Sequence, residues 1–220
     1  MSAYFITGTD TEVGKTFATC ALLHRYAAAG RRAVGMKPVA AGLDATGANE
    51  DVVQLAAASW VDVPAELINP YAFRSAVAPH LAAAADGREI RFAPIHAALA
   101  ELQRRAEVVL VEGVGGFRVP LGPEGDSADL AQTLGLPVIL VVGLRLGCIN
   151  HALLTVEAIQ VRGLRLAGWI ANTIDPTMAC LAENVATLDE AIVAPRLGLL
   201  PRAPLPGAAA LASVELLLPD

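Results

Sequence analysis

The sequence predicts an α/β fold, a single domain in which helices cover both faces of a mostly parallel sheet. Three observations lead to this prediction. Short apolar runs alternate with longer helical stretches, which is the pattern of parallel strands joined by crossover helices. Hydrophobic residues make up 55% of the chain and charged residues only 17%, as expected when strands are buried on both faces. The length of 220 residues fits one domain, so we expect residues 1–220 to form one unit.

The predicted elements alternate in order from the N-terminus. Apolar runs predict six strands, at Tyr4–Ile6, Ala33–Met36, Val108–Val111, Val138–Val142, Leu166–Ala171 and Leu197–Leu200. Apolar residues at helical spacing predict six helices, at Lys15–Ala29, Asp51–Ser59, Pro94–Arg105, Asp126–Leu134, Asn150–Arg162 and Met178–Ile192. The segment Pro201–Pro206 predicts a loop. Ligands of such sheets bind beyond the carboxyl ends of the strands, so functional residues are expected directly after each strand.

Charge, hydropathy and cysteine content exclude several classes of protein. Sixteen basic residues against 22 acidic ones give a net charge of −6, which argues against a broad surface for nucleic acid or anionic membrane. The longest apolar runs, such as Pro137–Leu144, are shorter than the roughly 18–20 residues of a membrane helix. The first residues show no basic segment before a long apolar one, so no signal peptide is expected. Cys20, Cys148 and Cys180 form no close pair, which favours free thiols in a cytoplasmic protein.

A glycine loop followed by Lys-Thr stands directly after the first predicted strand, as Gly-Thr-Asp-Thr-Glu-Val-Gly-Lys-Thr at 8–16. Gly8 and Gly14 permit a tight backbone path, and backbone N–H groups at a helix N-terminus can cradle phosphate oxygens. Lys15 can reach the β- and γ-phosphates of a nucleotide, and the Thr16 hydroxyl can ligate Mg²⁺. The usual loop has four residues between its glycines, and this one has five. The segment predicts a fold of the phosphate-loop NTPase type.

Two acidic residues and a second lysine are candidates for completing a site for a metal and a nucleotide. Glu112 ends the third predicted strand and Asp51 begins a predicted helix. With Thr16 they form an oxygen set that suits Mg²⁺, which takes one or two carboxylates besides phosphates and water. Lys37 ends the second strand, where it could offset charge on a transferring phosphoryl group. Plainer explanations are a loop acid in solvent, an acid that satisfies a helix dipole, and a strand-end lysine in solvent.

Seven segments, in order along the chain, resemble the dethiobiotin synthetase family. The long phosphate loop with Thr-Glu-Val-Gly-Lys-Thr at 11–16 is specific to that family, and Leu-Gly-Cys-Ile-Asn-His at 146–151 is more so. The resemblance runs from residue 3 to about residue 205. The other segments are Lys-Pro-Val-Ala at 37–40, Asn-Pro-Tyr at 69–71, Ala-Pro-His at 78–80, Val-Glu-Gly-Val-Gly-Gly at 111–116 and Ala-Asn-Thr at 171–173.

The resemblance implies an ATP-dependent cyclo-ligase of biotin biosynthesis. Such an enzyme closes a cyclic urea on 7,8-diaminopelargonate (7,8-diaminononanoate) with CO₂ and MgATP, giving dethiobiotin, ADP and phosphate. One amine would take up CO₂ as a carbamate, and the carbamate oxygen would attack the γ-phosphate. The second amine would then close the ring and expel phosphate. The family is a cytoplasmic homodimer, so a second copy of this chain is the expected partner.

The resemblance also implies roles for particular residues of this chain. Lys37, Lys15 and Thr11 would be catalytic, with Thr11 orienting the carbamate or the amine. Thr16, Asp51 and Glu112 would hold Mg²⁺. ATP would lie against Glu12, Val13, Gly14, Lys15, Thr16 and Phe17, and its adenine against Asn172, Leu200, Pro201 and Arg202. The diamine would contact Thr11, Lys37, Ala41, Pro79, His80 and Gly115, together with Gly147, Cys148, Ile149 and Asn150 of the partner subunit.

Some of these residues have a plainer explanation. Asn150 alone could cap a helix, Asn172 could belong to a turn, and His80 and Cys148 could be structural. Two positions depart from the family pattern. Ala41 stands where close relatives often carry Ser, and Asn184 stands where some place a tyrosine from the partner subunit. We expect modestly weaker substrate binding and no loss of activity.

Three other function classes compete with the synthetase. A regulatory ATPase of the partitioning or cell-division-site type would carry a lysine early in the phosphate loop, where this chain has Thr9 and Asp10. A dinucleotide-dependent oxidoreductase would need G-x-G-x-x-G spacing, which the segment from Gly8 to Gly14 lacks. A nucleotide-binding module without catalytic activity would have no need of Lys37 and a second acidic set.

Overall fold

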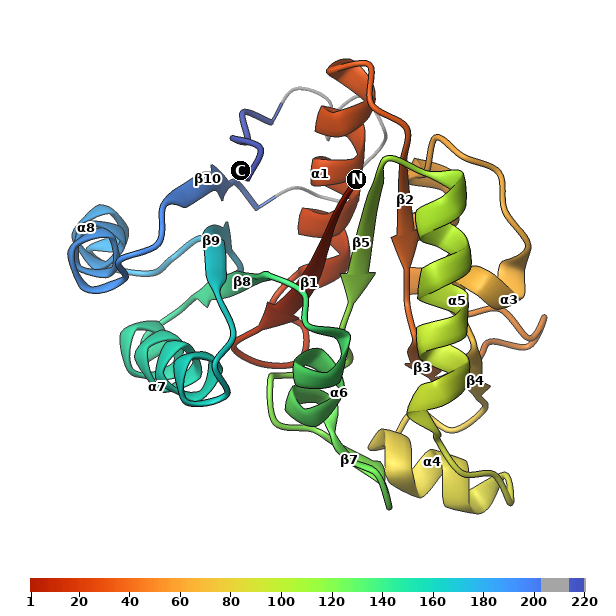
Figure 1. Ribbon diagram of the computed structural model, residues 1–220. Helices are drawn as coiled ribbons and strands as arrows, with labels where there is room; N and C mark the ends of the chain where they lie inside the picture. The colour runs from red at the N-terminus through yellow and green to blue at the C-terminus, as the bar shows by residue number, and fades with distance from the viewer. Residues whose placement is uncertain (203–213, 220) are drawn as a thin grey trace.

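A six-stranded sheet in the order β10-β9-β8-β1-β5-β2 forms the centre of the computed structural model, which describes residues 1–202 and 214–219 (Figure 1). Every neighbouring pair of strands is parallel. The six predicted strands are all confirmed, with bounds that differ by at most two residues. They are β1 (Ser2–Gly8), β2 (Ala33–Met36), β5 (Val108–Glu112), β8 (Val138–Leu144), β9 (Leu166–Thr173) and β10 (Arg196–Leu200).

The six predicted helices are also present. They are α1 (Lys15–Ala28), α2 (Glu50–Ala58), α5 (Phe92–Arg105), α6 (Ser127–Leu134), α7 (Cys148–Val161) and α8 (Leu181–Ala191). The prediction began α8 at Met178, but Cys180 is its N-cap. None of the helices in the described ranges is both long and apolar enough to cross a membrane.

Helices cover both faces of the sheet because successive residues of a strand point to opposite sides. Tyr4 and Ile6 of β1 pack in one cluster with α1 and α2, whereas Phe5 packs in another with α5 and α6. Trp169 of β9 is fully buried against α7 and α8. Every residue of β5 and β8 is buried, which explains why their sequences are continuous apolar runs.

Six short elements were not predicted, because strands of two or three residues and helices of four or seven residues are too short to show a hydrophobic period. Around the sheet lie α3 (Ala65–Ile68), α4 (Pro79–Ala85), the parallel pair of β3 (Val39–Ala41) and β4 (Tyr71–Phe73), and the antiparallel pair of β6 (Pro120–Gly122) and β7 (Gly125–Asp126). Pro201 and Arg202 continue β10 without regular structure. The rest of the predicted loop, residues 203–206, lies outside the described residues.

Candidate nucleotide and substrate site

The phosphate loop, residues 9–14, connects the end of β1 to the start of α1 at the carboxyl edge of the sheet. Gly14 takes φ +85° at the N-cap of α1, a conformation that glycine adopts without steric cost. Glu12 takes φ +60°, which is uncommon for a residue with a side chain. The loop therefore reaches α1 through a tight turn, and the free N–H groups of that helix N-terminus favour an anion.

Lys15 is the first residue of α1 and is only 6% exposed. Its Nζ donates a hydrogen bond to the carbonyl oxygen of Asp10 at 3.2 Å. Desolvation by burial, helped by repulsion from Lys37, lowers the pKa of Lys15 to about 8. The Asp10 side chain in turn accepts from the N–H of Thr11 at 2.8 Å and from Arg145 at 2.7 Å. The site thus contains a buried lysine whose charged form a nearby anion would stabilise.

Thr16, Lys37, Asp51 and Glu112 meet beside the phosphate loop. The Thr16 Oγ1 atom lies 2.8 Å from Asp51 Oδ1 and 2.8 Å from Glu112 Oε1. The Lys37 ammonium donates to Asp51 Oδ2 at 2.8 Å and to Glu112 Oε1 at 2.6 Å. Lys37 and Glu112 are buried, with side chains 4% and 0% exposed. Buried charges persist when they are paired, so the structure contradicts the plainer explanations of Lys37 and Glu112 as residues in solvent.

The ion pairs determine the charge states of this cluster. Burial by itself would lower the pKa of Lys37, but attraction by Glu112 and Asp51 outweighs burial and raises the pKa. Burial would raise the pKa of Asp51, and the Lys37 ammonium outweighs that effect and lowers the pKa. Lys37 is therefore a cation and Asp51 an anion at neutral pH.

The oxygen atoms of this cluster fit a hard divalent cation. Glu112 Oε2 is buried and has no hydrogen-bond partner among the described residues, which leaves a carboxylate oxygen available as a ligand. The described part of the chain contains no cluster of three or more His, Cys, Asp or Glu side chains that could hold a metal. Two carboxylates and the Thr16 hydroxyl instead match the donor set of Mg²⁺, which completes its shell with phosphates and water.

A cavity of about 800 Å³ opens in front of the cluster, and we call it the substrate cavity because residues predicted for the diamine line it. Thr11 and Gly115 are close neighbours on its wall, because a Cβ at Gly115 would lie 3.5 Å from Thr11 Oγ1 and 2.9 Å from Val119. Glycine at this position keeps the space open. The cavity brings together residues predicted for the diamine, the metal and the phosphates, namely Thr11, Glu12, Gly14, Lys15, Thr16, Lys37, Ala41, Asp51, Pro79 and Gly115.

A smaller cavity of about 290 Å³ adjoins the phosphate loop, and Glu12 lines both cavities. Five residues predicted for the nucleotide line it, namely Glu12, Phe17, Asn172, Pro201 and Arg202. Asn172 lies inside β9 and its Nδ2 donates to the carbonyl oxygen of Val13 at 2.8 Å. The alternative that Asn172 is a turn residue is therefore wrong. Leu200 is fully buried in the core, so only its backbone remains available for a ligand.

The other predicted substrate residues line neither cavity in the described chain. His80 lies on α4 and lines a separate cavity of about 400 Å³ with Arg88 and Leu121. Gly147 is the N-cap of α7, so Asn150 lies within the first turn and the alternative of an Asn150 cap is wrong. Cys148 is buried, as a packing residue would be. The segment 147–150 therefore has no contact with the substrate cavity of its own chain.

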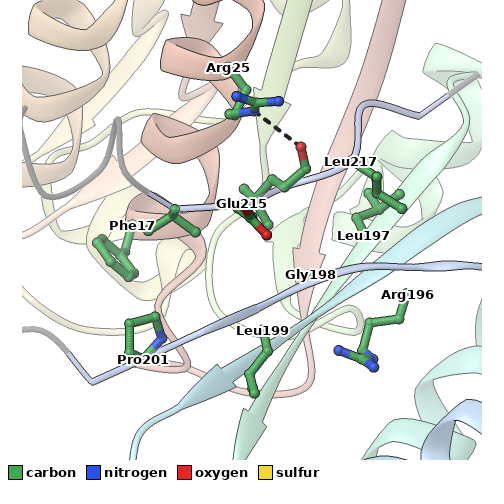
Figure 2. A pocket seen from close by; sticks show the side chains of 11 residues that line it. Phe17, Arg25, Arg196, Leu197, Gly198, Leu199, Pro201, Glu215 and Leu217 are labelled. Carbon is green, nitrogen blue, oxygen red and sulfur yellow. Dashed lines mark hydrogen bonds between the residues drawn. The ribbon is translucent and has the colours of Figure 1, made fainter.

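A third cavity, of about 840 Å³, lies between α1, β10 and residues 214–217 (Figure 2). Arg25 of α1 donates its Nε–H to the carbonyl oxygen of Leu216 at 3.2 Å across this space. Phe17 and Pro201 line both this cavity and the smaller one beside the phosphate loop. Its described lining contains a single carboxylate, Glu215, and no lysine. This cavity therefore lacks the lysines and the acidic pair that meet beside the phosphate loop.

Several residues around the substrate cavity were not predicted. Asn49 lines the cavity, caps α2 and donates to the carbonyl oxygen of Gly42 at 3.0 Å. Its place before two acids at a helix start is a capping pattern that the sequence did offer. The pair of Arg145 with Asp10 spans 135 residues of chain, and no local pattern indicates such a contact. The remaining residues of the lining are Ala40, Glu50, Gln54, Ala76, Val77, Ala78, Val114 and Val119.

The comparisons with solved structures agree with the fold. The MinD cell division protein of Aquifex aeolicus matches with a TM-score of 0.58 and 17% identity, covering 93% of this chain and 84% of that one. The cell division protein FtsY of Thermotoga maritima matches with a TM-score of 0.54 and 15% identity, covering 96% and 68%. Likeness at this level of identity shows the fold alone, and it confirms the predicted phosphate-loop NTPase type.

Comparisons at the level of sequence are closer. A family model described as an AAA domain matches residues 2–209. The ATP-dependent dethiobiotin synthetase BioD of Aromatoleum aromaticum is 60% identical over 202 residues, which cover 90% of this chain and 90% of the relative. The BioD protein of Ralstonia nicotianae is 56% identical over 212 residues, covering 95% and 93%. Identity of this degree over almost the whole length shows that the chain belongs to the family of ATP-dependent dethiobiotin synthetases, which are ligases of biotin biosynthesis.

Proposed function

We propose that this chain converts 7,8-diaminopelargonate, CO₂ and MgATP to dethiobiotin, ADP and phosphate, and that residues 1–220 act as one catalytic domain. Membership of the family supports the reaction class. One feature of the site carries the assignment of residues. Lys15, Thr16, Lys37 and Asp51 border one cavity, and Glu112 lies directly behind them in contact with Thr16 and Lys37. Two cations and an oxygen set for a metal thus surround the place where a triphosphate would end.

Thr16, Asp51 and Glu112 would hold Mg²⁺ in this proposal. The available Oε2 atom of Glu112 and the two 2.8 Å contacts of Thr16 support the assignment. Bound Mg²⁺ would offset negative charge on the β- and γ-phosphate oxygens. Lys37 contacts both carboxylates and offsets part of their charge before a nucleotide arrives.

The lysines serve the phosphoryl transfer. After one amine has taken up CO₂, the carbamate oxygen attacks the γ-phosphorus and the bond to ADP breaks. Negative charge spreads over the transferring group, where the ammonium groups of Lys15 and Lys37 can offset it. ATP would reach this position with its phosphates on the loop residues Glu12 to Phe17 and its adenine in the smaller cavity, beside Asn172, Pro201, Arg202 and the backbone of Leu200.

Ring closure depends on proximity more than on a protein nucleophile. The second amine attacks the carbonyl carbon of the carbamic–phosphoric anhydride and expels phosphate. We propose that the diamine lies beside Thr11 and Gly115, which are neighbours on the wall of the cavity, and beside Lys37, Ala41 and Pro79. Holding both amines next to the γ-phosphate turns each step into an intramolecular one.

We further propose that the working enzyme is a homodimer in which the partner subunit's Gly147–Asn150 segment binds the substrate carboxylate. The N-terminus of α7 offers free N–H groups for an anion, and this segment does not line the substrate cavity of its own chain. The three cysteines are free, which supports a reducing location, the cytoplasm.

Mixed dimers test the shared site. Chains that carry K37A are combined, through unfolding and refolding, with chains that carry N150A, and each variant alone is expected to be impaired. A mixed dimer would hold one site without either substitution, so about a quarter of wild-type activity should return at equal mixing. Activity that stays at the level of the separate variants would show that each chain forms its whole site.

The first test of the function measures ADP release from MgATP with and without 7,8-diaminopelargonate and bicarbonate, with mass spectrometry of the product. We expect ADP release that requires both additions and yields one dethiobiotin per ADP. Turnover stimulated by another protein or by lipid vesicles, without dethiobiotin, would instead support a regulatory ATPase of the cell-division-site type.

A further inference from the structure

Asn172 has contacts that reach beyond the cavity proposed for the base. The residue lies near the end of β9 and is 6% exposed. Its Nδ2 atom donates to the carbonyl oxygen of Val13 at 2.8 Å, across 159 residues of chain. A Cβ at Gly14 would overlap the same Nδ2 atom, so the amide also packs against the residue that precedes α1. One N–H of Asn172 is therefore bonded to the phosphate loop and is not free for a base in this structure.

Val13 is the point at which the sheet anchors the loop. Its side chain is 1% exposed. A Cβ at Gly8 would lie 2.6 Å from Val13 Cγ2, and one at Gly143 would lie 2.8 Å from Val13 Cγ1. Packing against β1 and β8 thus fixes the side chain of Val13, and the hydrogen bond from β9 fixes its carbonyl group.

The residues on either side of Val13 explain why the loop needs such an anchor. Glu12 and Gly14 both have positive φ, at +60° and +85°. Left-handed conformation is unfavourable for a residue with a side chain such as Glu12, and it persists where the surroundings over-determine it. The Asn172–Val13 hydrogen bond is directly adjacent and supplies part of that constraint.

We propose that Asn172 is a positioning residue for the phosphate loop, acting through the Val13 carbonyl oxygen, in addition to its proposed contact with the base. The inference rests on the proposed nucleotide site. A base contact and a loop tether differ in their effect on a ligand that has phosphates but no base. Loss of a base contact would leave such a ligand unaffected. Loss of the tether would weaken the binding of such a ligand, because only the fraction of molecules with a correctly shaped loop can bind.

Magnesium tripolyphosphate is a suitable ligand without a base. Its dissociation constant and that of MgATP are measured by titration calorimetry for the wild type, N172A and T173A. Thr173 lines the same small cavity as Asn172 and makes no side-chain hydrogen bond with the described residues, so T173A is the matched control. We expect N172A to weaken the binding of both ligands by about tenfold, since the buried carbonyl group of Val13 has lost its donor. T173A should leave tripolyphosphate binding within about twofold of the wild type.

Two results would overturn the inference. N172A could weaken MgATP while tripolyphosphate binds as in the wild type, which would make Asn172 a base contact only. T173A could weaken tripolyphosphate as much as N172A does, which would show a general disturbance of the cavity. If thermal unfolding shows that N172A does not fold, N172S takes its place, because its hydroxyl keeps a polar atom in the site but is too short to reach Val13. Neither ligand needs the diamine, so failure to make dethiobiotin would leave these binding results intact.

Discussion

The Lys37–Glu112 pair is a buried ion pair, and such pairs contribute little to stability. Taking both charges out of water costs about as much as their attraction returns, so an apolar pair of similar volume is often equally stable. Asp51 and Thr16 nevertheless add three contacts of 2.8 Å to this cluster, Thr16–Asp51, Thr16–Glu112 and Lys37–Asp51. Charge held at this place is better explained by a function that needs charge than by stability.

Glu112→Gln tests this explanation. The substitution keeps the shape of the side chain but removes a charge from the proposed metal site. We expect kcat to fall by roughly 100-fold, as when one stabilising group of an active site is removed, and the Mg²⁺ concentration for half-maximal activity to rise. Glu183→Gln, at an exposed carboxylate on α8, is the control. Unchanged Mg²⁺ dependence in the Glu112 variant would remove Glu112 from the metal site.

The low pKa of Lys15 predicts how nucleotide binding depends on pH. Burial, with repulsion from Lys37, lowers this pKa to about 8, so Lys15 is charged below pH 8 and neutral above it. The ammonium form binds phosphate, so affinity for MgADP should be constant up to pH 7.5 and then fall by up to about tenfold per pH unit. Titration calorimetry between pH 7 and pH 9.5 measures this affinity at each pH.

Lys15→Arg is the control, because a guanidinium stays charged throughout this range. Its affinity for MgADP, although different in magnitude, should not change between pH 7 and pH 9.5. A parallel decline in both proteins would trace the pH dependence to a group other than Lys15.

A hydroxyl at position 41 is expected to improve substrate binding. Ala41 lines the substrate cavity but carries no hydroxyl at a position where the family resemblance leads us to expect serine. Ala41→Ser should lower the KM for 7,8-diaminopelargonate by about two- to tenfold, the effect of one added hydrogen bond, with the KM for ATP unchanged. Steady-state kinetics with each substrate varied in turn measures both constants. An equal change in both KM values would mean that residue 41 affects the site as a whole.

At the scale of elements, the N-termini of the helices differ in how they are capped. α1 begins at Gly14 with no side-chain cap, which leaves its N–H groups available for a ligand. In α6, Asp126 accepts from the N–H of Asp129 at 2.9 Å, and Asp129 accepts from the N–H of Asp126 at 2.8 Å. The first N–H groups of α6 are thus partly occupied by its own side chains, whereas α1, like α5, α7 and α8, has no side-chain cap.

Asp126→Ala should therefore destabilise the protein. Loss of an N-cap side chain costs about 1 kcal/mol of unfolding free energy, and Arg118 also loses its partner here. Urea unfolding followed by circular dichroism gives the change in the free energy of unfolding. Asp86→Ala is the control, because Asp86 is exposed at the end of α4 and makes no side-chain hydrogen bond with the described residues. Equal stability of the two variants would argue that the α6 cap contributes nothing.

At the scale of the whole molecule, the C-terminal residues join the core that α1 forms on the sheet. Leu216 is 2% exposed within that cluster. The Leu217 N–H donates to the carbonyl oxygen of Leu197 at 2.7 Å, and the Tyr4 hydroxyl donates to that of Pro219 at 3.1 Å. Residues 214–219 therefore belong to the folded unit, although more than ten residues separate them from β10.

The packing of the whole molecule predicts which thiols react. Burial raises the pKa of Cys20 to about 12, Cys148 is buried and Cys180 is exposed. A thiol reagent such as DTNB at pH 8 should therefore modify one cysteine per native chain and all three after denaturation. Cys180→Ser should reduce the native count to zero. Fast reaction of a second thiol in the native protein would mean that the core around α1 or α7 opens readily.

The local pattern of the chain was sufficient to predict the six long strands, the six long helices and the phosphate loop. Hydrophobic period, a glycine loop and its position after a strand are properties of neighbouring residues. The short elements β3, β4, β6, β7, α3 and α4 carry too few residues for such a period. They form because the larger elements place their segments side by side.

The sequence by itself therefore determined the fold class and the chemistry of single residues, including the two lysines and the candidate metal ligands. Only the tertiary structure decided which of them meet. Thr16, Asp51 and Glu112 come from three distant segments, yet the Thr16 hydroxyl lies 2.8 Å from an oxygen of each carboxylate. The Asn172–Val13 bond, the Arg145–Asp10 pair and the placement of His80 in a separate cavity also depend on contacts between distant segments. Such contacts leave no local pattern in the sequence, because they arise only when the parallel sheet brings the carboxyl ends of its strands to one edge.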